Sequence, residues 1–366
     1  MNASFFEIGV LVSFIIVGSF REMTLFIIPA AASVTLFFTV SLMLISALFS
    51  WIKGWTFSVF IVLFVLINFS FSGLEMINLH SGAYGLDYEV EPADYSPEFI
   101  NSINLQDSIA IADKENTISI LEKWKVKNQK GQELPKMVII NTSGGGLRSA
   151  LWSTSSLMRA DSICNGELLQ HTVLMTGSSG GMIGSSMVRE SMLESQIPSI
   201  QEKENQISRD LLNPVMLSIA TNDLFIRYQK FEEGNSCFTK DRAYAFEQQL
   251  HANTHGMFNK PMSEYQTDEA EAQIPMMVLA PSIVNDGRRM VISATPMSYM
   301  CQNGTEQVIN GEMYAEDIEF QRFFAEQDAL NLKWSSALRM NATFPYILPV
   351  TSLPSEPEIG LMDAGL

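Results

Sequence analysis

Long apolar runs dominate the first 73 residues and limit where this part of the chain can lie. A membrane-crossing helix takes about 20 apolar residues. The runs cover residues 5–20, 24–50 and 55–71. We therefore predict a transmembrane region over residues 1–73 with about three helices, and an integral, multi-pass membrane protein.

A cleaved signal peptide is the alternative for the first run. Glu7 stands where basic residues would be expected, however, and two further apolar runs follow at once, so anchoring is favoured. Arg21 and Lys53 flank the second run on opposite sides, and the distribution of positive charge therefore predicts no orientation.

The composition restricts the class of partner. Of the 366 residues, 47% are hydrophobic and only 17% are charged, and the formal net charge is -17. Nucleic acid is excluded as a partner, because phosphate binding needs clustered Lys and Arg. Membrane lipid is the expected partner. The three cysteines are far apart and predict neither a disulfide framework nor a zinc site; they are Cys164, Cys237 and Cys301.

The rest of the chain divides into a linker and a folded domain. Residues 74–113 are rich in acidic residues, Gly, Tyr and Pro, which predicts an extended juxtamembrane linker. From residue 114 to 366 short apolar strands alternate with helical segments, as in a sheet covered by helices. The predicted strands are 137–140, 172–175, 276–280 and 290–293. Helical patterns cover a segment around Trp124 and residues 147–160, 205–228 and 240–250, whereas the acidic segment 264–273 is expected to be solvated.

The segment Gly177-Ser178-Ser179-Gly180-Gly181 fits the G-x-S-x-G nucleophile elbow. It follows a predicted strand and precedes a segment of small residues at helical spacing, as that motif requires. The spacing selects Ser179 as the nucleophile, with Gly177 and Gly181 giving room where strand and helix nearly touch. A flexible Gly/Ser loop is the alternative for a pattern this short.

A second glycine-rich segment also follows a strand and precedes a helix. Gly144, Gly145 and Gly146 leave backbone N–H groups unobstructed, and Leu147 and Arg148 come next. The Gly-Lys-Ser/Thr ending of a P-loop is missing, and Ser149 stands where a dinucleotide fingerprint has its last glycine. We therefore expect this loop to stabilise an oxyanion, and we expect no cofactor and no metal.

A serine nucleophile needs a base, and the sequence offers two kinds. In the usual order of serine hydrolases, His251 or His255 would follow the serine, but neither has a flanking turn signal. The alternative is Asp363, which a short apolar strand delivers onto a turn of small residues close to the chain's end. A carboxylate acts on a hydroxyl only in a dry site with tight geometry.

Three segments, in this order, resemble the hallmarks of the patatin-like phospholipases: GGGLR at 144–148, GSSGG at 177–181 and DAG at 363–365. Residues 335–349, SSALRMNATFPYILP, are similar to the helix and proline-containing turn that precede the aspartate in that family. The resemblance spans roughly residues 136–366. It implies a three-layer α/β/α fold, a Ser179–Asp363 dyad, an oxyanion loop at Gly144–Arg148, hydrolysis of lipid esters through an acyl-enzyme, and the cytoplasmic side of a membrane.

The sequence departs from the family's pattern in three places. Ser149 replaces a usual glycine after the arginine, and Ala364 replaces the glycine that commonly follows the aspartate. The family also continues beyond the point where this sequence stops, so a shortened and inactive form is one expectation. Two further functions compete with the patatin-like hydrolase: a His-assisted serine esterase or acyltransferase, and an inactive, lipid-binding membrane scaffold.

Overall fold

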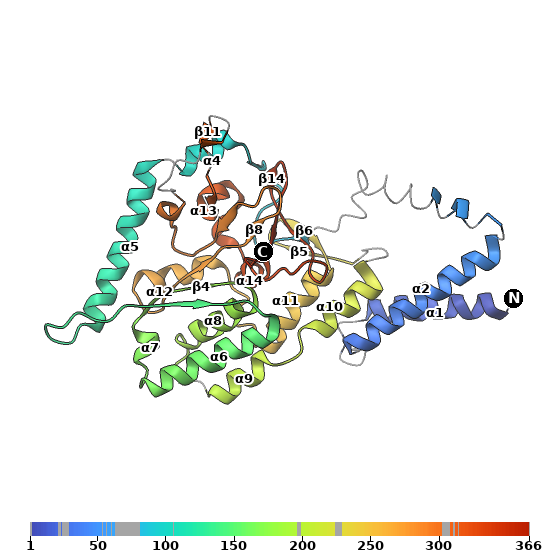
Figure 1. The fold of residues 1–366 in the computed structure, drawn as a ribbon, viewed down its shortest axis with the longest axis horizontal. Helices are drawn as coiled ribbons and strands as arrows, with labels where there is room; N and C mark the ends of the chain where they lie inside the picture. Colours follow the sequence, from blue (N-terminus) through green and yellow to red (C-terminus); the bar gives the residue numbers. More distant parts are fainter. Residues whose placement is uncertain are drawn as a thin grey trace.

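The computed structural model describes residues 2–20, 23, 29–52, 54–55, 57–59, 61–62, 81–104, 106–195, 199–223, 229–301, 308–309, 312–313 and 315–365. Together they form a mixed α/β domain with two apolar helices at one end (Figure 1). The helices are α1 (Asn2–Ser19), α2 (Ala30–Ile52), α4 (Pro97–Asn104), α5 (Asp107–Asn128), α6 (Gly146–Ile163), α7 (Glu167–Gln170), α8 (Ser179–Ser191), α9 (Ile200–Ile207), α10 (Leu212–Ser218), α11 (Arg242–Asn253), α12 (Gln266–Ala270), α13 (Phe320–Phe323) and α14 (Trp334–Met340). The strands are β1 (Ser81–Gly82), β2 (Ala93–Asp94), β3 (Val138–Thr142), β4 (Thr172–Gly177), β5 (Lys230–Glu233), β6 (Ser236–Thr239), β7 (Met276–Leu279), β8 (Ser282–Ile283), β9 (Arg289–Val291), β10 (Val308–Ile309), β11 (Glu312–Met313), β12 (Asp317–Glu319), β13 (Thr351–Leu353), β14 (Ser355–Glu356) and β15 (Ile359–Met362).

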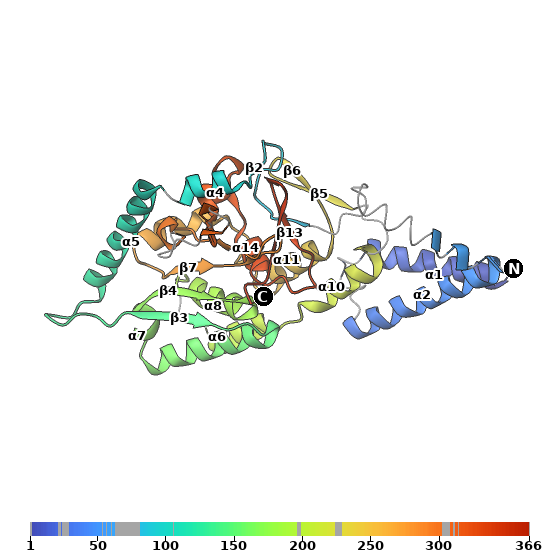
Figure 2. The same ribbon diagram turned by 45° about the horizontal axis from the view of Figure 1, so that its top comes forward.

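A parallel three-stranded sheet, in the order β3-β4-β7, carries the first two motifs. All four side chains of β7 are buried, because helices cover both of its faces. Met276 belongs to the cluster that contains Trp124 of α5, and Met277 to the cluster that contains Met182 of α8. In both views α6 and α8 lie on the opposite side of this sheet from α5 (Figures 1 and 2).

The predicted strands at 137–140, 172–175, 276–280 and 290–293 are confirmed as β3, β4, β7 and β9. The helical segments around Trp124 and at 147–160 and 240–250 are confirmed as α5, α6 and α11. The mixed α/β class is thus confirmed, whereas the patatin-like form of the three layers stays a prediction.

A six-stranded mixed sheet, in the order β1-β13-β15-β8-β9-β12, carries the third motif. It meets the parallel sheet at a bridge between Leu279, the last residue of β7, and Ile292. Strand β15 runs antiparallel to both of its neighbours, and Met362 pairs with Ser282 at the start of β8. Asp363 therefore emerges close to the end of β7, on the same side as the end of β4.

The acidic segment 74–113 is not an extended linker in its described part. From residue 81 onward it belongs to the domain, because β1 pairs with β13 and β2 pairs with β14. Several of its apolar residues, among them Leu86 and Ile100, lie in the main core cluster. The acidic side chains are mostly at the surface, which explains why composition alone suggested a linker.

Two other expectations also differ from the structure. The acidic segment 264–273 is not fully solvated, because the side chain of Glu269 is completely buried and pairs with buried Arg189 at 2.8 Å. The helix predicted over 205–228 is broken between α9 and α10, and α10 continues into a π-helical turn, Ile219–Asp223. Residues 224–228 lie outside the described part of the chain.

The N-terminal helices α1 and α2 lie side by side and meet the domain at α10 and the π-helical turn (Figures 1 and 2). Within the described residues, one helix is long and apolar enough to cross a membrane: α2, over Ala30–Ala47, with a mean hydropathy of 2.0. The structure thus supports one candidate span where three were predicted. The third predicted run, 55–71, lies largely outside the described residues.

Candidate active site

The GSSGG segment forms a sharp turn from strand β4 into helix α8. Strand β4 ends at Gly177 and α8 begins at Ser179, which is the strand–turn–helix context predicted for an elbow. Ser179 is half-buried and has a φ of +53°, a backbone conformation that non-glycine residues rarely adopt. Such strain persists only where the surroundings hold it, and it concentrates at functional sites.

The glycines of the elbow leave room that no other residue would leave. A Cβ on Gly177, whose φ is +151°, would lie 2.2 Å from the carbonyl oxygen of Thr142 at the end of β3. A Cβ on Gly181 would lie 2.3 Å from the carbonyl oxygen of Ser143. The elbow therefore packs directly against the backbone of β3 and of the loop that follows it.

The glycine-rich loop lies beside the elbow and leads into α6. The N–H of Gly144 donates to the Ser178 hydroxyl at 3.1 Å, and Gly145 and Gly146 both have positive φ angles. All three glycines are exposed. A hydrogen bond of 2.5 Å from the Ser149 hydroxyl to the Ser143 carbonyl closes the loop, so Ser149 has a bracing role here.

Helix α6 begins at Gly146, and the N–H groups of its first turn point out of the helix end. These groups have no acceptor within the helix, and the positive end of the helix dipole lies at the same place. The half-buried side chain of Leu147 packs against the main core, whereas Arg148 is exposed. The predicted oxyanion loop therefore presents N–H donors and a positive side chain to solvent next to Ser179.

Asp363 lies in a turn that directly follows β15 and is only 5% exposed. Its N–H donates to the Thr343 carbonyl at 3.1 Å, and its Oδ1 accepts from the N–H of Gly365 at 2.7 Å. The position that a Cβ on Gly365 would take lies 3.1 Å from this Oδ1 and 3.7 Å from the Ser178 Oγ. The structure thus places the Asp363 turn against the elbow.

The two predicted catalytic side chains are not hydrogen-bonded to each other. Within the described residues there is no hydrogen bond between the Ser179 hydroxyl and the Asp363 carboxylate. Catalytic hydrogen bonds are often long in free enzymes and tighten when substrate binds. If the two side chains act as a dyad, the aspartate and the serine hydroxyl have to come into hydrogen-bond contact during the reaction.

Asn341 is a site residue that the sequence analysis did not predict, although it lies within the patatin-like segment 335–349. It is fully buried at the end of α14, and it hydrogen-bonds to both the elbow and the Asp363 turn. The sequence signal is weak, because helix α14 has the mixed sequence WSSALRM and a polar residue directly after it does not stand out. Its partners are backbone groups far away in the chain, and the sequence cannot reveal these.

The two histidines predicted as alternative bases, His251 and His255, are not bonded to the elbow in the described part of the chain. Burial lowers the pKa of His251, and the charged neighbours of that imidazole are Glu247, Lys333 and Glu233. His255 follows α11 with a φ of +53°. In the described part of the chain neither histidine hydrogen-bonds to Ser179, so the structure brings Asp363, and not His251 or His255, to the elbow.

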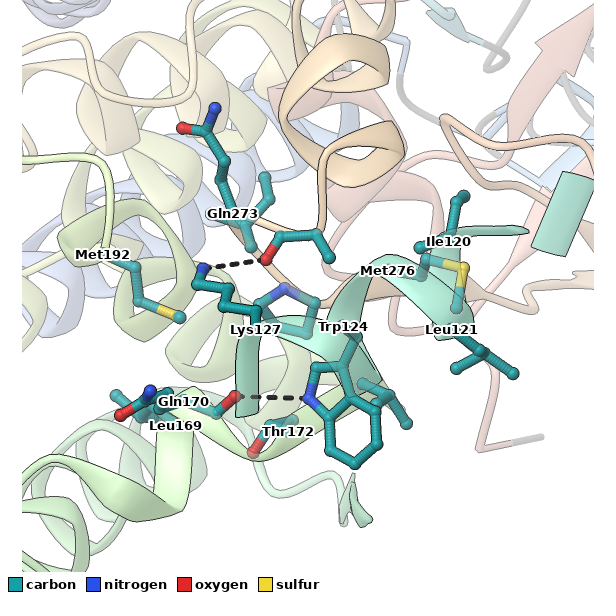
Figure 3. Close-up of a pocket in the computed structure, with 14 residues that line it drawn as sticks. Ile120, Leu121, Trp124, Lys127, Leu169, Gln170, Thr172, Met192, Gln273 and Met276 are labelled. Carbon is teal, nitrogen blue, oxygen red and sulfur yellow. Dashed lines mark hydrogen bonds between the residues drawn. The ribbon is translucent and has the colours of Figure 1, made fainter. Parts of the chain in front are cut away.

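Cavities lie elsewhere in the domain. The small cavity in Figure 3, about 20 Å³, is a seam between α5 and the sheet, where Trp124 donates to the Gln170 carbonyl at 3.3 Å and Lys127 to the Ala272 carbonyl at 2.9 Å. A larger one of about 600 Å³ lies at the far end of α8 and includes Val188. Since a helix rises about 1.5 Å per residue, Val188 is about 13 Å along α8 from Ser179. Among the described residues, no three His, Cys, Asp or Glu side chains gather as a metal site.

Comparison with known proteins assigns no family to the chain. No model of a protein family matches the sequence, and no curated protein matches it significantly.

Proposed function

We propose that the protein is a membrane-anchored serine acyl hydrolase of the patatin-like type, which cleaves carboxylic ester bonds of phospholipids or related lipids. The observation that carries this proposal is the strained conformation of Ser179 at a strand-to-helix turn. An exposed glycine-rich loop and the turn of a buried aspartate both lie beside this turn: the Gly144 N–H donates to the Ser178 hydroxyl at 3.1 Å, and a Cβ on Gly365 would lie 3.7 Å from the same Oγ.

Each group has one step in the proposed reaction. The Ser179 Oγ attacks the ester carbonyl carbon while its proton passes to the Asp363 carboxylate. The negative charge on the carbonyl oxygen is stabilised by N–H groups of Gly145 and Gly146 and the first turn of α6, and the leaving alcohol takes the proton from Asp363. A water molecule, deprotonated by the same aspartate, then attacks the acyl-enzyme carbonyl; the bond to the Ser179 Oγ breaks, this oxygen takes the proton back from Asp363, and the fatty acid is released.

Burial favours Asp363 in this role. This side chain is almost entirely removed from solvent, so few water molecules compete with the serine hydroxyl for the carboxylate. Its Oδ1 is held by the N–H of Gly365, which fixes the carboxylate orientation and leaves Oδ2 for the serine. The N–H of Gly144 is held by Ser178 in the free protein, so a substrate oxygen that used this donor would have to displace the Ser178 hydroxyl.

Lipid is the proposed substrate class because the chain brings its own membrane anchor. Helix α2 meets the length and composition of a membrane span, and the multi-pass arrangement over 5–20, 24–50 and 55–71 is part of this proposal. Anchoring raises the effective concentration of a membrane-bound ester at the site without any further contact.

The test is labelling of the full chain, in detergent, with a fluorophosphonate that reacts only with activated serines. We expect one modified peptide, containing Ser179, and no labelling of Ser179→Ala. Ser208→Ala, which removes an exposed hydroxyl at the end of α9, serves as the control and should label like the wild type. Folded wild-type protein that takes up no label would refute the proposal.

Two more variants separate the aspartate from the histidines. Asp363→Asn keeps an acceptor for the Gly365 N–H but removes the base, so hydrolysis of a short-chain ester should fall by roughly 100-fold or more. A double variant, His251→Ala with His255→Ala, should retain activity. The reverse pattern would favour a His-assisted esterase.

A further inference from the structure

Asn341 connects the elbow to the aspartate turn through its backbone. It caps the C-terminal end of α14 and is fully buried. Its carbonyl oxygen accepts the N–H of Ser179 at 3.0 Å and the N–H of Ala364, the residue after Asp363, at 3.5 Å. One oxygen atom thus contacts the backbone of the proposed nucleophile and the backbone next to the proposed base.

The side chain of Asn341 fixes the two strand ends that flank the site. Its Nδ2 donates to the Gly177 carbonyl at 3.2 Å, at the end of β4. Its Oδ1 accepts the N–H of Ala280 at 3.2 Å, directly after β7. A buried amide without partners is unfavourable, so these bonds hold the side chain in a single orientation.

Helix α14 gives Asn341 a rigid base. Glu247 of α11 accepts hydrogen bonds from the Ser335 and Ser336 hydroxyls and from the Nε of Arg339, at 2.6–2.7 Å. Trp334, at the other end of α14, donates its indole N–H to Ser186 of α8 at 2.7 Å. Helix α14 is therefore attached both to α11 and to the helix that begins at Ser179.

The strain at Ser179 needs bonds on both sides of the turn. A φ of +53° is unfavourable for a residue with a Cβ, and the elbow would relax if its neighbours were free. The Gly177 carbonyl and the Ser179 N–H lie on either side of the turn, and both bind Asn341. No other described residue is bonded to the elbow on both sides and to the Asp363 turn as well.

From these contacts we infer that Asn341 is the positioning residue of the site: it sets the separation and orientation of Ser179 relative to Asp363, and it acts through both backbones without touching substrate. This inference rests on the proposed hydrolase function. We therefore expect substitution of Asn341 to change the rate of the chemical step and not the affinity for substrate.

The test compares Asn341→Asp with Asn253→Asp in the full chain. Asn341→Asp keeps the acceptor for Ala280 but loses the donor to Gly177. Asn253 is the matched control, because it is also buried and its amide donates to the Arg209 and Asp210 carbonyls, away from the elbow. Asn341→Ser and Asn253→Ser form a second pair without a buried charge, for use if the aspartate variants do not fold.

The measurements are the unfolding midpoint, kcat and KM for a water-soluble short-chain ester, and the rate of fluorophosphonate labelling. We expect the Asn341 variant to lose at least about 10-fold in kcat and in labelling rate, which corresponds to about 1.4 kcal/mol, with KM changed by less than about two-fold. The Asn253 variant should lose a similar amount of stability and keep its kcat.

Two outcomes would overturn the inference, and they are distinguishable. Asn341 has only a structural role if the wild type is labelled at Ser179 and the folded Asn341 variant is labelled and hydrolyses ester at the same rate. The same conclusion holds if both asparagine variants lose kcat in proportion to their loss of stability. If the folded wild type neither labels nor hydrolyses esters, the proposed function fails and the inference fails with it.

Discussion

At the residue scale, Gly181 is needed for space and not for backbone freedom. Its φ lies outside the left-handed region, yet a Cβ there would come within 2.3 Å of the Ser143 carbonyl oxygen. Gly131 is the opposite case, with a φ of +66° and nothing within 4 Å of a Cβ. The two positions therefore separate the cost of a steric clash from the cost of an unfavourable φ.

We predict that Gly181→Ala lowers the free energy of unfolding by about 1–3 kcal/mol and also abolishes fluorophosphonate labelling, because the turn must move away from β3. Gly131→Ala should cost about 1–2 kcal/mol from its φ alone and label normally. Chemical denaturation and labelling of both variants test this. Normal labelling of Gly181→Ala would mean that the elbow tolerates displacement.

The ion pair between Arg339 and Glu247 is completely buried, and this decides its sensitivity to substitution. Removing one partner of such a pair leaves an uncompensated charge, which costs about 3–5 kcal/mol. We therefore predict that Glu247→Gln lowers the free energy of unfolding by that amount. Glu271→Gln, which breaks an exposed pair with Lys123, should change it by less than about 1 kcal/mol. Equal effects in denaturation experiments would contradict the buried position of α14.

Glu319 makes the stability of the domain depend on pH. The side chain is fully buried, and this burial raises its pKa from 4.5 to about 7, with a further increase from Asp113 and a decrease from hydrogen bonding and charge at Arg322. Between pH 4.5 and 7 the folded form keeps a proton that the unfolded form has lost. Stability must therefore fall as the pH rises through this range and then level off.

We predict that this residue makes the protein about 3 kcal/mol less stable at pH 8 than at pH 4.5, at about 1.4 kcal/mol per pKa unit. Glu319→Gln cannot ionise, so the difference in unfolding free energy between variant and wild type should grow in favour of the variant from pH 5 to pH 8. A difference that does not change with pH would show that Glu319 is ionised in the folded protein.

At the element scale, the sequence was informative where a pattern is local. The buried strands β4 and β7 are short apolar runs between turn residues, and the elbow and the glycine-rich loop follow such strands directly. Strands β1 and β2 have two residues each and exist only because β13 and β14, far along the chain, pair with them. Asn341 is bonded to Gly177 and Ala280, which are 164 and 61 residues away in the sequence, so neither feature leaves a local signal.

The segment between α14 and β13 presents two exposed aromatic side chains shortly after Thr343. Phe344 follows Thr343, whose carbonyl binds the Asp363 N–H, and Tyr346 is 90% exposed with a φ of +68°. Replacing Tyr346 with glycine would remove the steric cost of this positive φ and should stabilise the protein by about 1 kcal/mol. An exposed aromatic residue in a strained conformation next to the site is expected to contact the lipid surface.

We predict that Tyr346→Gly raises stability yet slows hydrolysis of an ester in vesicles several-fold, with no effect on a water-soluble short-chain ester. Asp328→Gly is the matched control, since Asp328 is also exposed, has a φ of +58° and lies in another turn. It should gain similar stability and hydrolyse both substrates normally. Equal rates of hydrolysis in vesicles for Tyr346→Gly and the wild type would show that the aromatic segment does not contact lipid.

At the scale of the whole molecule, the N-terminal helices are attached to the domain through a few specific contacts. The N–H of Ala30 at the start of α2 donates to Asn213 of α10 at 2.5 Å, and a Cβ on Gly18 of α1 would come within 2.7 Å of Thr221. Val40 is buried against Ala220, whereas Phe38 on another face of α2 is 59% exposed. Helix α2 thus uses one face for the domain and leaves an apolar face available to lipid.

This division of α2 predicts how the protein is held in a membrane. Phe38 lies at the middle of the candidate span, where an arginine costs about 2.5–3.5 kcal/mol of insertion free energy. Phe38→Arg should therefore release a large share of the protein from membranes during an alkaline carbonate wash. Val126→Arg, which adds the same charge to an exposed position on α5, should stay in the membrane fraction like the wild type. Full retention of Phe38→Arg would show that α2 is not the anchor, and membrane attachment of the folded domain would then depend on the other apolar runs.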